Sequence, residues 1–142
     1  MKEEMKFNSQ ICTSRKQSER LLALGFKPET ADMVLVPSSR HDGSDVIRVR
    51  KTYLMEEDAI HAWSLHRLIE MMPSVIYREG RLDYYLNVNR DGVIYDRMGI
   101  ACIEYIYDNL FDNIVLCIEW LIKEGYFKKE YLQEQTDSSR EE

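Results

Sequence analysis

Residues 82–97 read Leu82-Asp-Tyr-Tyr-Leu-Asn-Val-Asn-Arg-Asp-Gly-Val-Ile-Tyr-Asp-Arg97. Apolar and polar side chains alternate on both sides of Arg90-Asp-Gly92, a tripeptide typical of a tight turn. Alternation with a period of two is the pattern of a strand that buries one face. The stretch therefore predicts a β-hairpin, with strands at residues 82–89 and 93–97.

The register of this hairpin depends on the length of its loop. A three-residue loop, with Gly92 in the left-handed conformation, pairs Val88 with Ile94. We expect this loop and a positive φ at Gly92, although a two-residue loop would change which side chains share a face. With the three-residue loop, one face carries Tyr85, Asn87, Tyr95 and Arg97.

Further strands are expected on both sides of the hairpin, at residues 75–77 and 100–107. The second segment could instead begin a helix, but Asp108 or Asn109 is a good N-cap and favours the strand. The helix then covers residues 110–124 and ends at Gly125. Its central apolar stripe consists of Leu110, Ile114, Ile118 and Leu121.

The N-terminal half predicts short helices and two strands. Ser14 and Gln17 form a capping box for a helix at residues 14–24, and Pro28 suits the start of a short helical turn. Ser64 caps a helix at residues 65–72 that ends before Pro73. The apolar stripe of this helix is Leu65, Leu68, Ile69 and Met72. Strands are expected at residues 33–36 and 46–54, joined by a turn-forming loop.

Together these elements predict an α+β fold, in which an antiparallel β-meander packs against one long C-terminal helix and short helices precede it. A chain of 142 residues has the usual size of one domain. We expect a single globular domain over residues 1–135 and a polar, mobile tail over residues 136–142.

Charge and hydropathy narrow the range of partners. The chain has 19 Lys and Arg against 25 Asp and Glu, a net charge of -6 that disfavours binding to nucleic acid. A weak basic patch of Arg48, Arg50 and Lys51 remains, with Arg48 and Arg50 on the face of the strand opposite Ile47 and Val49. No apolar run suits a signal peptide or a membrane span, so we expect a cytoplasmic protein without a membrane partner.

No group of residues predicts catalysis or metal binding. His61 and His66 are five residues apart, which does not place two ligands on one helical face, and His41 with Asp42 and Asp45 lacks the spacing of a calcium loop. Glu56-Glu-Asp58 is typical of a solvated acidic run, and phosphate-loop, nucleophile-elbow and zinc-helix motifs are absent. We expect no catalytic residue, metal or cofactor.

The cysteines also favour a structural role. Three cysteines without a CxxC pair predict reduced, buried thiols, and they are Cys12, Cys102 and Cys117.

A possible interaction surface lies on the 110–124 helix. Leu116 and Trp120 are four residues apart but lie away from the central stripe, among Asp112 and Asn113. Either the chain after Gly125 packs over them, or Trp120 anchors self-association or a protein partner. The sheet could add to such a surface through Tyr85, Tyr95 and Arg97.

Four segments also carry a resemblance: Ile11–Gly25, Thr30–Met33, Ala62–Ile69 and Ile118–Tyr126. They resemble a family of small proteins of uncharacterised activity from Bacteroides and related gut bacteria, often associated with prophages or other mobile elements. The resemblance spans most of residues 8–132, and the part between Met33 and Ala62 is shorter here than in the relatives. It implies a bacterial, mobile-element context and no activity, cofactor or catalytic residue.

These observations favour a non-enzymatic interaction or accessory module of a mobile element. The alternative is a small enzyme or ligand-binding protein whose site forms only in the fold, with Arg48, Arg50, His41 and Tyr85 as participants. A deep pocket lined by those four residues would favour the alternative.

Overall fold

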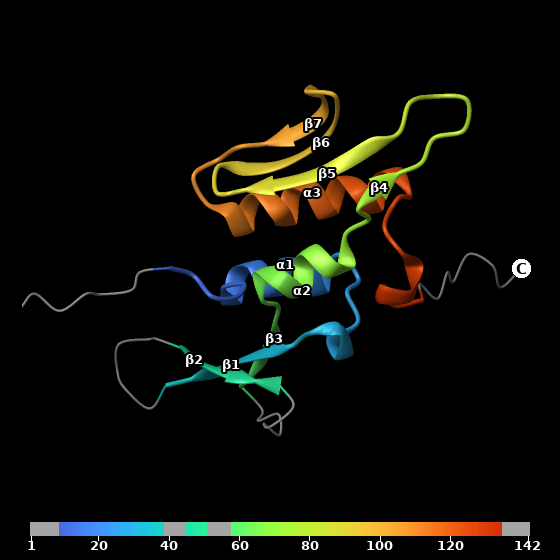
Figure 1. The fold of residues 1–142 in the computed structure, drawn as a ribbon. Coiled ribbons are helices and arrows are strands. Elements are labelled where there is room, and N and C mark those ends of the chain that lie inside the picture. The colour runs from blue at the N-terminus through green and yellow to red at the C-terminus, as the bar shows by residue number, and fades with distance from the viewer. Residues whose placement is uncertain (1–8, 39–44, 51–57, 135–142) are drawn as a thin grey trace, which may run out of the picture.

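A computed structural model describes residues 9–38, 45–50 and 58–134 of the chain. In the order of the sequence, its elements are α1 (Arg15–Ala23), η1 (Pro28–Thr30), β1 (Met33–Pro37), β2 (Asp45–Val49), β3 (Ile60–Ala62), α2 (Leu65–Met71), β4 (Val75–Ile76), β5 (Tyr84–Asn89), β6 (Gly92–Arg97), β7 (Ile100–Tyr105), α3 (Leu110–Glu124) and η3 (Lys129–Tyr131). Figure 1 shows two sheets at opposite ends of the molecule, with the three α-helices between them.

The larger sheet has four antiparallel strands in the order β4-β5-β6-β7, a meander in which each strand pairs with the next along the chain. Helix α3 lies against one face of this sheet (Figure 1) and contacts β6 and β7. The α+β class, the meander and the long C-terminal helix predicted from the sequence are therefore confirmed. The strand at residues 100–107, for which a helix was the alternative, is β7.

The hairpin between β5 and β6 has the two-residue loop, so the predicted register and the positive φ of Gly92 are wrong. Asn89 pairs with Gly92, and Val88 pairs with Val93. Gly92 is required for another reason, because a Cβ there would lie 2.2 Å from the carbonyl oxygen of Tyr105 on the neighbouring strand. This close approach of two strands is a non-local contact that the turn sequence does not reveal.

The changed register moves Tyr95 into the core. Tyr95 pairs with Leu86 and is fully buried, and its hydroxyl donates a hydrogen bond of 2.7 Å to the carbonyl oxygen of Pro73. Burial raises the pKa of this phenol. The expectation that Tyr95 contributes to an interaction surface is therefore corrected, since its side chain is part of the hydrophobic core.

The helix ends follow the local sequence signals. The capping box of Ser14 and Gln17 is present at α1, Ser64 caps α2, and Asn109 caps α3. Gly125 ends α3 in the left-handed conformation with a φ of 80°. In α2, Leu68 is fully buried. These caps fix where each helix begins, and hence which residues it presents to its neighbours.

The smaller sheet has the order β2-β1-β3, with β1 in the centre. The pairing of β1 with the short strand β3 was not predicted, and it buries Val34, Leu35 and Ala62. In β2, Ile47, Arg48 and Val49 are all exposed, so that strand does not divide into one buried and one exposed face. Residues 51–57, which include the rest of the predicted strand, lie outside the described residues, as does the predicted tail.

Candidate functional site

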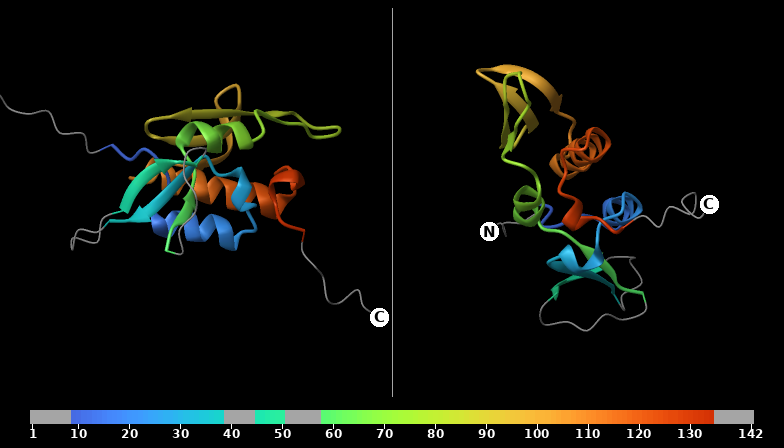
Figure 2. Two further views of the ribbon diagram at one scale, coloured as in Figure 1. Left: turned by 90° about the horizontal axis from the view of Figure 1, so that it is seen from below. Right: turned by 90° about the vertical axis from the view of Figure 1, so that its right-hand side faces the viewer.

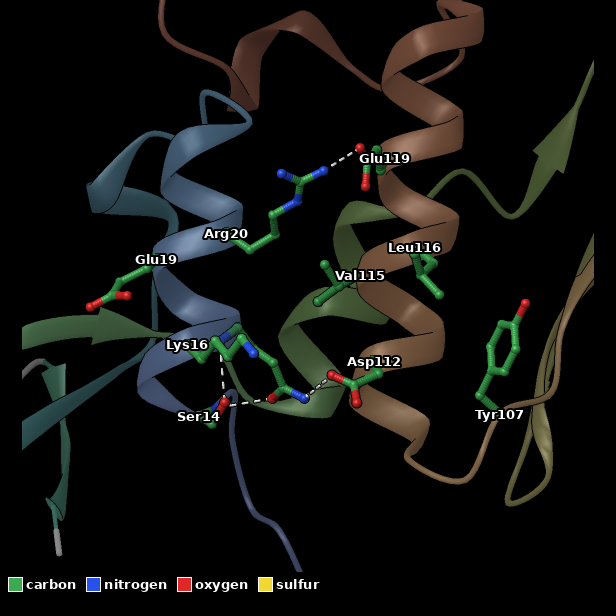
Figure 3. Close-up of a pocket in the computed structure, with 10 residues that line it drawn as sticks. Ser14, Lys16, Glu19, Arg20, Tyr107, Asp112, Val115, Leu116 and Glu119 are labelled. Atoms are coloured by element: carbon green, nitrogen blue, oxygen red, sulfur yellow. Dashed lines mark hydrogen bonds and ion pairs between the residues drawn. The ribbon is translucent and has the colours of Figure 1, made fainter. Parts of the chain in front are cut away.

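A groove of about 860 Å³ lies between α1 and α3 and continues over α3 to Tyr107, in the connection that precedes α3 (Figure 3). The two helices run in the same direction, and the connection between β7 and α3 adds one aromatic side chain to the wall (Figure 3). The residues that line the groove are Ser14, Lys16, Gln17, Glu19, Arg20, Tyr107, Asp112, Val115, Leu116 and Glu119. Its size falls in the range of roughly 300–1,000 Å³ that is usual for ligand sites.

Hydrogen bonds between the two helix N-termini fix one end of the groove. The side-chain amide of Gln17 donates to Asp112 Oδ1 at 2.6 Å and to Asn109 Oδ1 at 3.3 Å. The same Gln17 side chain accepts the Ser14 backbone N–H at 2.9 Å, as the capping box requires. Gln10 completes the network, because it donates to Gln17 Oε1 and accepts from Asn109 Nδ2. The capping residues of α1 and α3 are thus joined directly to each other.

An ion pair spans the groove further along the helices. Arg20 on α1 contacts the carboxylate of Glu119 on α3, and both side chains are partly exposed. Such an exposed pair contributes little stability, but it links the two helices across the groove. Both carboxylates that α3 contributes to the groove are thus engaged, Asp112 by Gln17 and Glu119 by Arg20.

The apolar wall of the groove is partly exposed. Val115 is buried beneath it, whereas Leu116 is 38% exposed and Tyr107 is 65% exposed. Figure 3 shows the Tyr107 ring beyond Leu116, on the side of α3 away from α1. An aliphatic and an aromatic side chain exposed together form the kind of apolar patch that contacts a partner.

A buried asparagine fixes the backbone that carries Tyr107. Asn113 is fully buried, its Nδ2 donates to the Tyr107 carbonyl oxygen at 2.9 Å, and its Oδ1 accepts the Tyr107 N–H at 2.8 Å. The Asn113 side chain therefore binds both the backbone N–H and the backbone carbonyl of Tyr107. From its sequence position Asn113 was expected on the polar side of the helix, and this expectation is wrong. A polar residue next to an apolar stripe is the only signal in the sequence that could have revealed it.

The structure separates the residues of the predicted interaction surface. Leu116 lines the groove, but Trp120 packs between Tyr95 and Tyr126, at ring-centroid distances of 6.2 and 5.7 Å. The chain after Gly125 thus covers Trp120, as one of the two sequence-based alternatives held. Tyr85 and Arg97 belong to the four-stranded sheet, and neither lines the groove.

Two of the three residues of the weak basic patch, Arg48 and Arg50, lie within the described residues. Arg48 is exposed, whereas the Arg50 guanidinium donates to the Glu29 carbonyl oxygen at 2.9 Å. Lys51 and His41 lie outside the described residues. Arg48 and Arg50 also lie with the smaller sheet, at the opposite end of the molecule from Tyr85 (Figure 1). Of the residues named for a hidden active site, Tyr85 therefore does not converge with Arg48 and Arg50.

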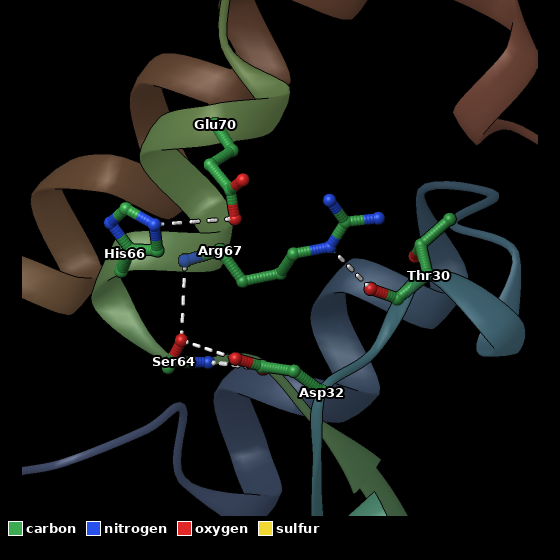
Figure 4. A network of polar contacts seen from close by, with 6 residues as sticks. All are labelled: Thr30, Asp32, Ser64, His66, Arg67 and Glu70. Atoms are coloured by element: carbon green, nitrogen blue, oxygen red, sulfur yellow. Dashed lines mark hydrogen bonds and ion pairs between the residues drawn. The ribbon is translucent and has the colours of Figure 1, made fainter. Parts of the chain in front are cut away.

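A second polar cluster, shown in Figure 4, joins η1 to the start of α2. Ser64 donates both its N–H and its hydroxyl to Asp32, and its hydroxyl oxygen accepts the Arg67 N–H at 3.2 Å. His66 lies beside Ser64 in the sequence but pairs with Glu70 at 3.6 Å (Figure 4). The hydroxyl of Ser64 is thus occupied by helix capping, and neither of the two described histidines contacts it to act as a base.

The remaining histidine and the cysteines do not form a further site. In the described part of the chain, no three His, Cys, Asp or Glu side chains lie close enough to hold a metal ion. Burial, followed by the nearby Arg50, lowers the pKa of His61. Cys12 and Cys117 are buried, whereas Cys102 is exposed, so the expectation of three buried thiols is corrected.

Comparisons with known proteins do not assign a family. No family model matches the chain, and the searches of curated proteins and of solved structures found no match. None of the helices in the described ranges is long and apolar enough to cross a membrane.

Proposed function

We propose that this protein is a non-enzymatic interaction module, and that the groove between α1 and α3 holds a segment of a protein partner. The observation that carries the proposal is the exposed pair of Leu116 and Tyr107, presented on a fixed backbone. Rigid presentation of apolar side chains lowers the entropy lost on binding, so more of the contact energy contributes to affinity. The resemblance described above supports an accessory role in a bacterial mobile element.

The groove favours a partner segment of a particular chemistry. Leu116 and Tyr107 offer contacts to one apolar side chain of the partner. On the α1 side, Lys16 is exposed and makes no hydrogen bond or ion pair with other described residues, so it is available to a carboxylate. The segment that fits is an apolar residue flanked by an acidic one.

The arrangement supports binding more than catalysis. Catalysis of proton transfer needs an acid or base that is free to reach the substrate. Three carboxylates line the groove: Asp112 accepts from Gln17, Glu119 pairs with Arg20, and the exposed Glu19 lies on the side of α1 away from α3 (Figure 3). Asp112 and Glu119 therefore hold the two helices together, and the exposed side chains are left to contact the partner.

A peptide selection tests the proposal. Random peptides displayed on phage are selected on the immobilised protein, and the enriched peptides are measured against Tyr107→Ala and Leu116→Ala. Tyr77→Ala is the matched control, because Tyr77 is 78% exposed and does not line the groove. We expect enriched peptides with an apolar residue beside an acidic one. Each groove variant should raise the dissociation constant of these peptides by about 5- to 30-fold, as loss of a central contact residue does.

The control variant should bind these peptides as the wild type does. Absence of any enriched peptide, or equal binding by all three variants, would contradict the proposal.

A further inference from the structure

The chain enters the described structure at one end of the groove between α1 and α3. The anchor is Gln10, whose side-chain amide donates to Gln17 Oε1 at 2.6 Å and to the Cys12 carbonyl oxygen at 2.8 Å. Its own Oε1 accepts from Asn109 Nδ2 at 3.0 Å. Figure 2 shows α1 and α3 side by side, with the incoming chain at the end where both helices begin. The N-terminal segment, residues 1–8, is therefore tethered beside the groove.

This N-terminal segment carries the side chains that the groove favours. It reads Met1-Lys-Glu-Glu-Met-Lys-Phe-Asn8, so the apolar Met5 directly follows an acidic residue. The groove offers Leu116 and Tyr107 to an apolar side chain, and Lys16 lines its α1 side. The segment thus matches the apolar and the cationic contacts of the groove together.

The C-terminal segment of the chain does not match the groove in this way. Residues 135–142 read Gln-Thr-Asp-Ser-Ser-Arg-Glu-Glu, and none of them has a large apolar side chain. They also follow Gln133, whose N–H donates to the Gly25 carbonyl oxygen just past the C-terminal end of α1. That segment therefore leaves the molecule at the opposite end of α1 from the anchor at Gln10.

The N-terminal segment is long enough to reach the apolar wall. Leu116 lies seven residues beyond Asn109, which is about 10 Å along a helix that rises roughly 1.5 Å per residue. Asn8 and Ser9 are of residue types that favour turns, so the chain is able to reverse there and run back along the groove. Three extended residues separate this turn from Met5, a span of about 10 Å. Met5 therefore reaches the level of Leu116.

We infer that the N-terminal segment occupies the groove when no partner is bound, with Met5 against Leu116 and Tyr107, and that a partner must displace it. The inference rests on the proposed function, because it concerns the same groove and the same contacts. Charge favours this occupant, since Glu4 adjoins Met5 and Lys16 makes no ion pair with other described residues. Tethering favours it as well, because a segment joined to its site has a high effective concentration there.

Two double variants of the full chain test the occupant. Met5→Ser with Phe7→Ser removes the internal apolar side chains of the segment and is called the apolar variant. Lys2→Ser with Lys6→Ser changes the same number of residues, keeps those apolar side chains and is called the lysine variant. Both variants change only residues that precede the described structure, so its core is left as it is.

The first readout is the set of backbone amide chemical shifts of the free protein. The apolar variant should move the shifts of Tyr107 and Leu116, because the groove loses its occupant. The lysine variant should leave both shifts as in the wild type, and the amides of the smaller sheet should stay the same in both variants. The inference is overturned if the apolar variant leaves the shifts of Tyr107 and Leu116 unchanged, or if both variants move them equally.

The second readout is the affinity of the phage-selected peptides. The apolar variant should bind them with a dissociation constant about 2- to 10-fold lower than the wild type, which corresponds to a groove occupied for roughly half to nine-tenths of the time. Equal dissociation constants overturn the inference but leave the proposed function standing. If no peptide binds either protein, the proposed function fails, and the amide shifts alone decide whether the N-terminal segment lies in the groove.

Discussion

Replacement of Asn113 by alanine should release the connection that presents Tyr107 to the groove. The side chain makes two hydrogen bonds with the Tyr107 backbone, of 2.8 and 2.9 Å, from a fully buried position. Each is worth about 0.5–1.5 kcal/mol net, so their loss should cost about 1–3 kcal/mol of folding stability. With a urea m-value of about 2 kcal/mol/M, the unfolding midpoint should fall by roughly 1 M.

Two assays separate this local effect from general destabilisation. Urea titration gives the loss of stability, and hydrogen exchange at the Tyr107 amide reports the local release, since that amide loses its acceptor. Asn87→Ala is the control, because Asn87 is exposed on β5 and should change neither measurement. If the Tyr107 amide stays as protected in Asn113→Ala as in the wild type, Asn113 does not fix this connection.

Three further predictions concern the core and the thiols. Gly92→Ala should destabilise the fold by about 1–3 kcal/mol in urea, because its Cβ would meet the Tyr105 carbonyl oxygen at 2.2 Å; unchanged stability would refute this contact. Trp120→Ala should lower the free energy of unfolding by about 3–5 kcal/mol, or less if the site collapses, because the ring packs between two tyrosines. The oligomeric state should not change, and a loss of association without a loss of stability would contradict this prediction. Burial raises the pKa of Cys117 to about 12 and so favours its neutral thiol in the folded state. This stabilisation is complete below the unfolded pKa of about 9 and is lost as the pH rises toward 12. Alkaline titration should therefore lower the stability of the chain over that window, and Cys117→Ala should make the loss of stability with pH less steep.

Local signals were the most reliable part of the sequence. The capping box of Ser14, an N-cap at Asp108 or Asn109 and the left-handed Gly125 were predicted; the capping box and Gly125 are present, and Asn109 is the N-cap. Each depends on residues within four positions of one another, so the chain nearby contains the full physical reason. The order of elements and the fold class follow from these boundaries and from the apolar periodicity between them.

Contacts between distant segments were not predictable in the same way. The contact that requires glycine at position 92 comes from Tyr105 on another strand, and the pairing of β1 with β3 joins short segments across a long connection. The groove likewise depends on the hydrogen bond between Gln17 and Asp112, which are 95 residues apart. Leu116 was singled out from its position on the helix alone, but Tyr107, which lines the same groove, belongs to a connection whose backbone is hydrogen-bonded by Asn113.

The most direct test of the central claim is a map of backbone amide chemical shifts during titration with a selected peptide. The account predicts that the shifts change along the two groove walls, in α1 from Ser14 to Arg20, in α3 from Asp112 to Glu119, and at Tyr107. Shift changes confined to the smaller sheet or to the outer face of the four-stranded sheet would contradict this prediction, because the peptide would then bind outside the groove.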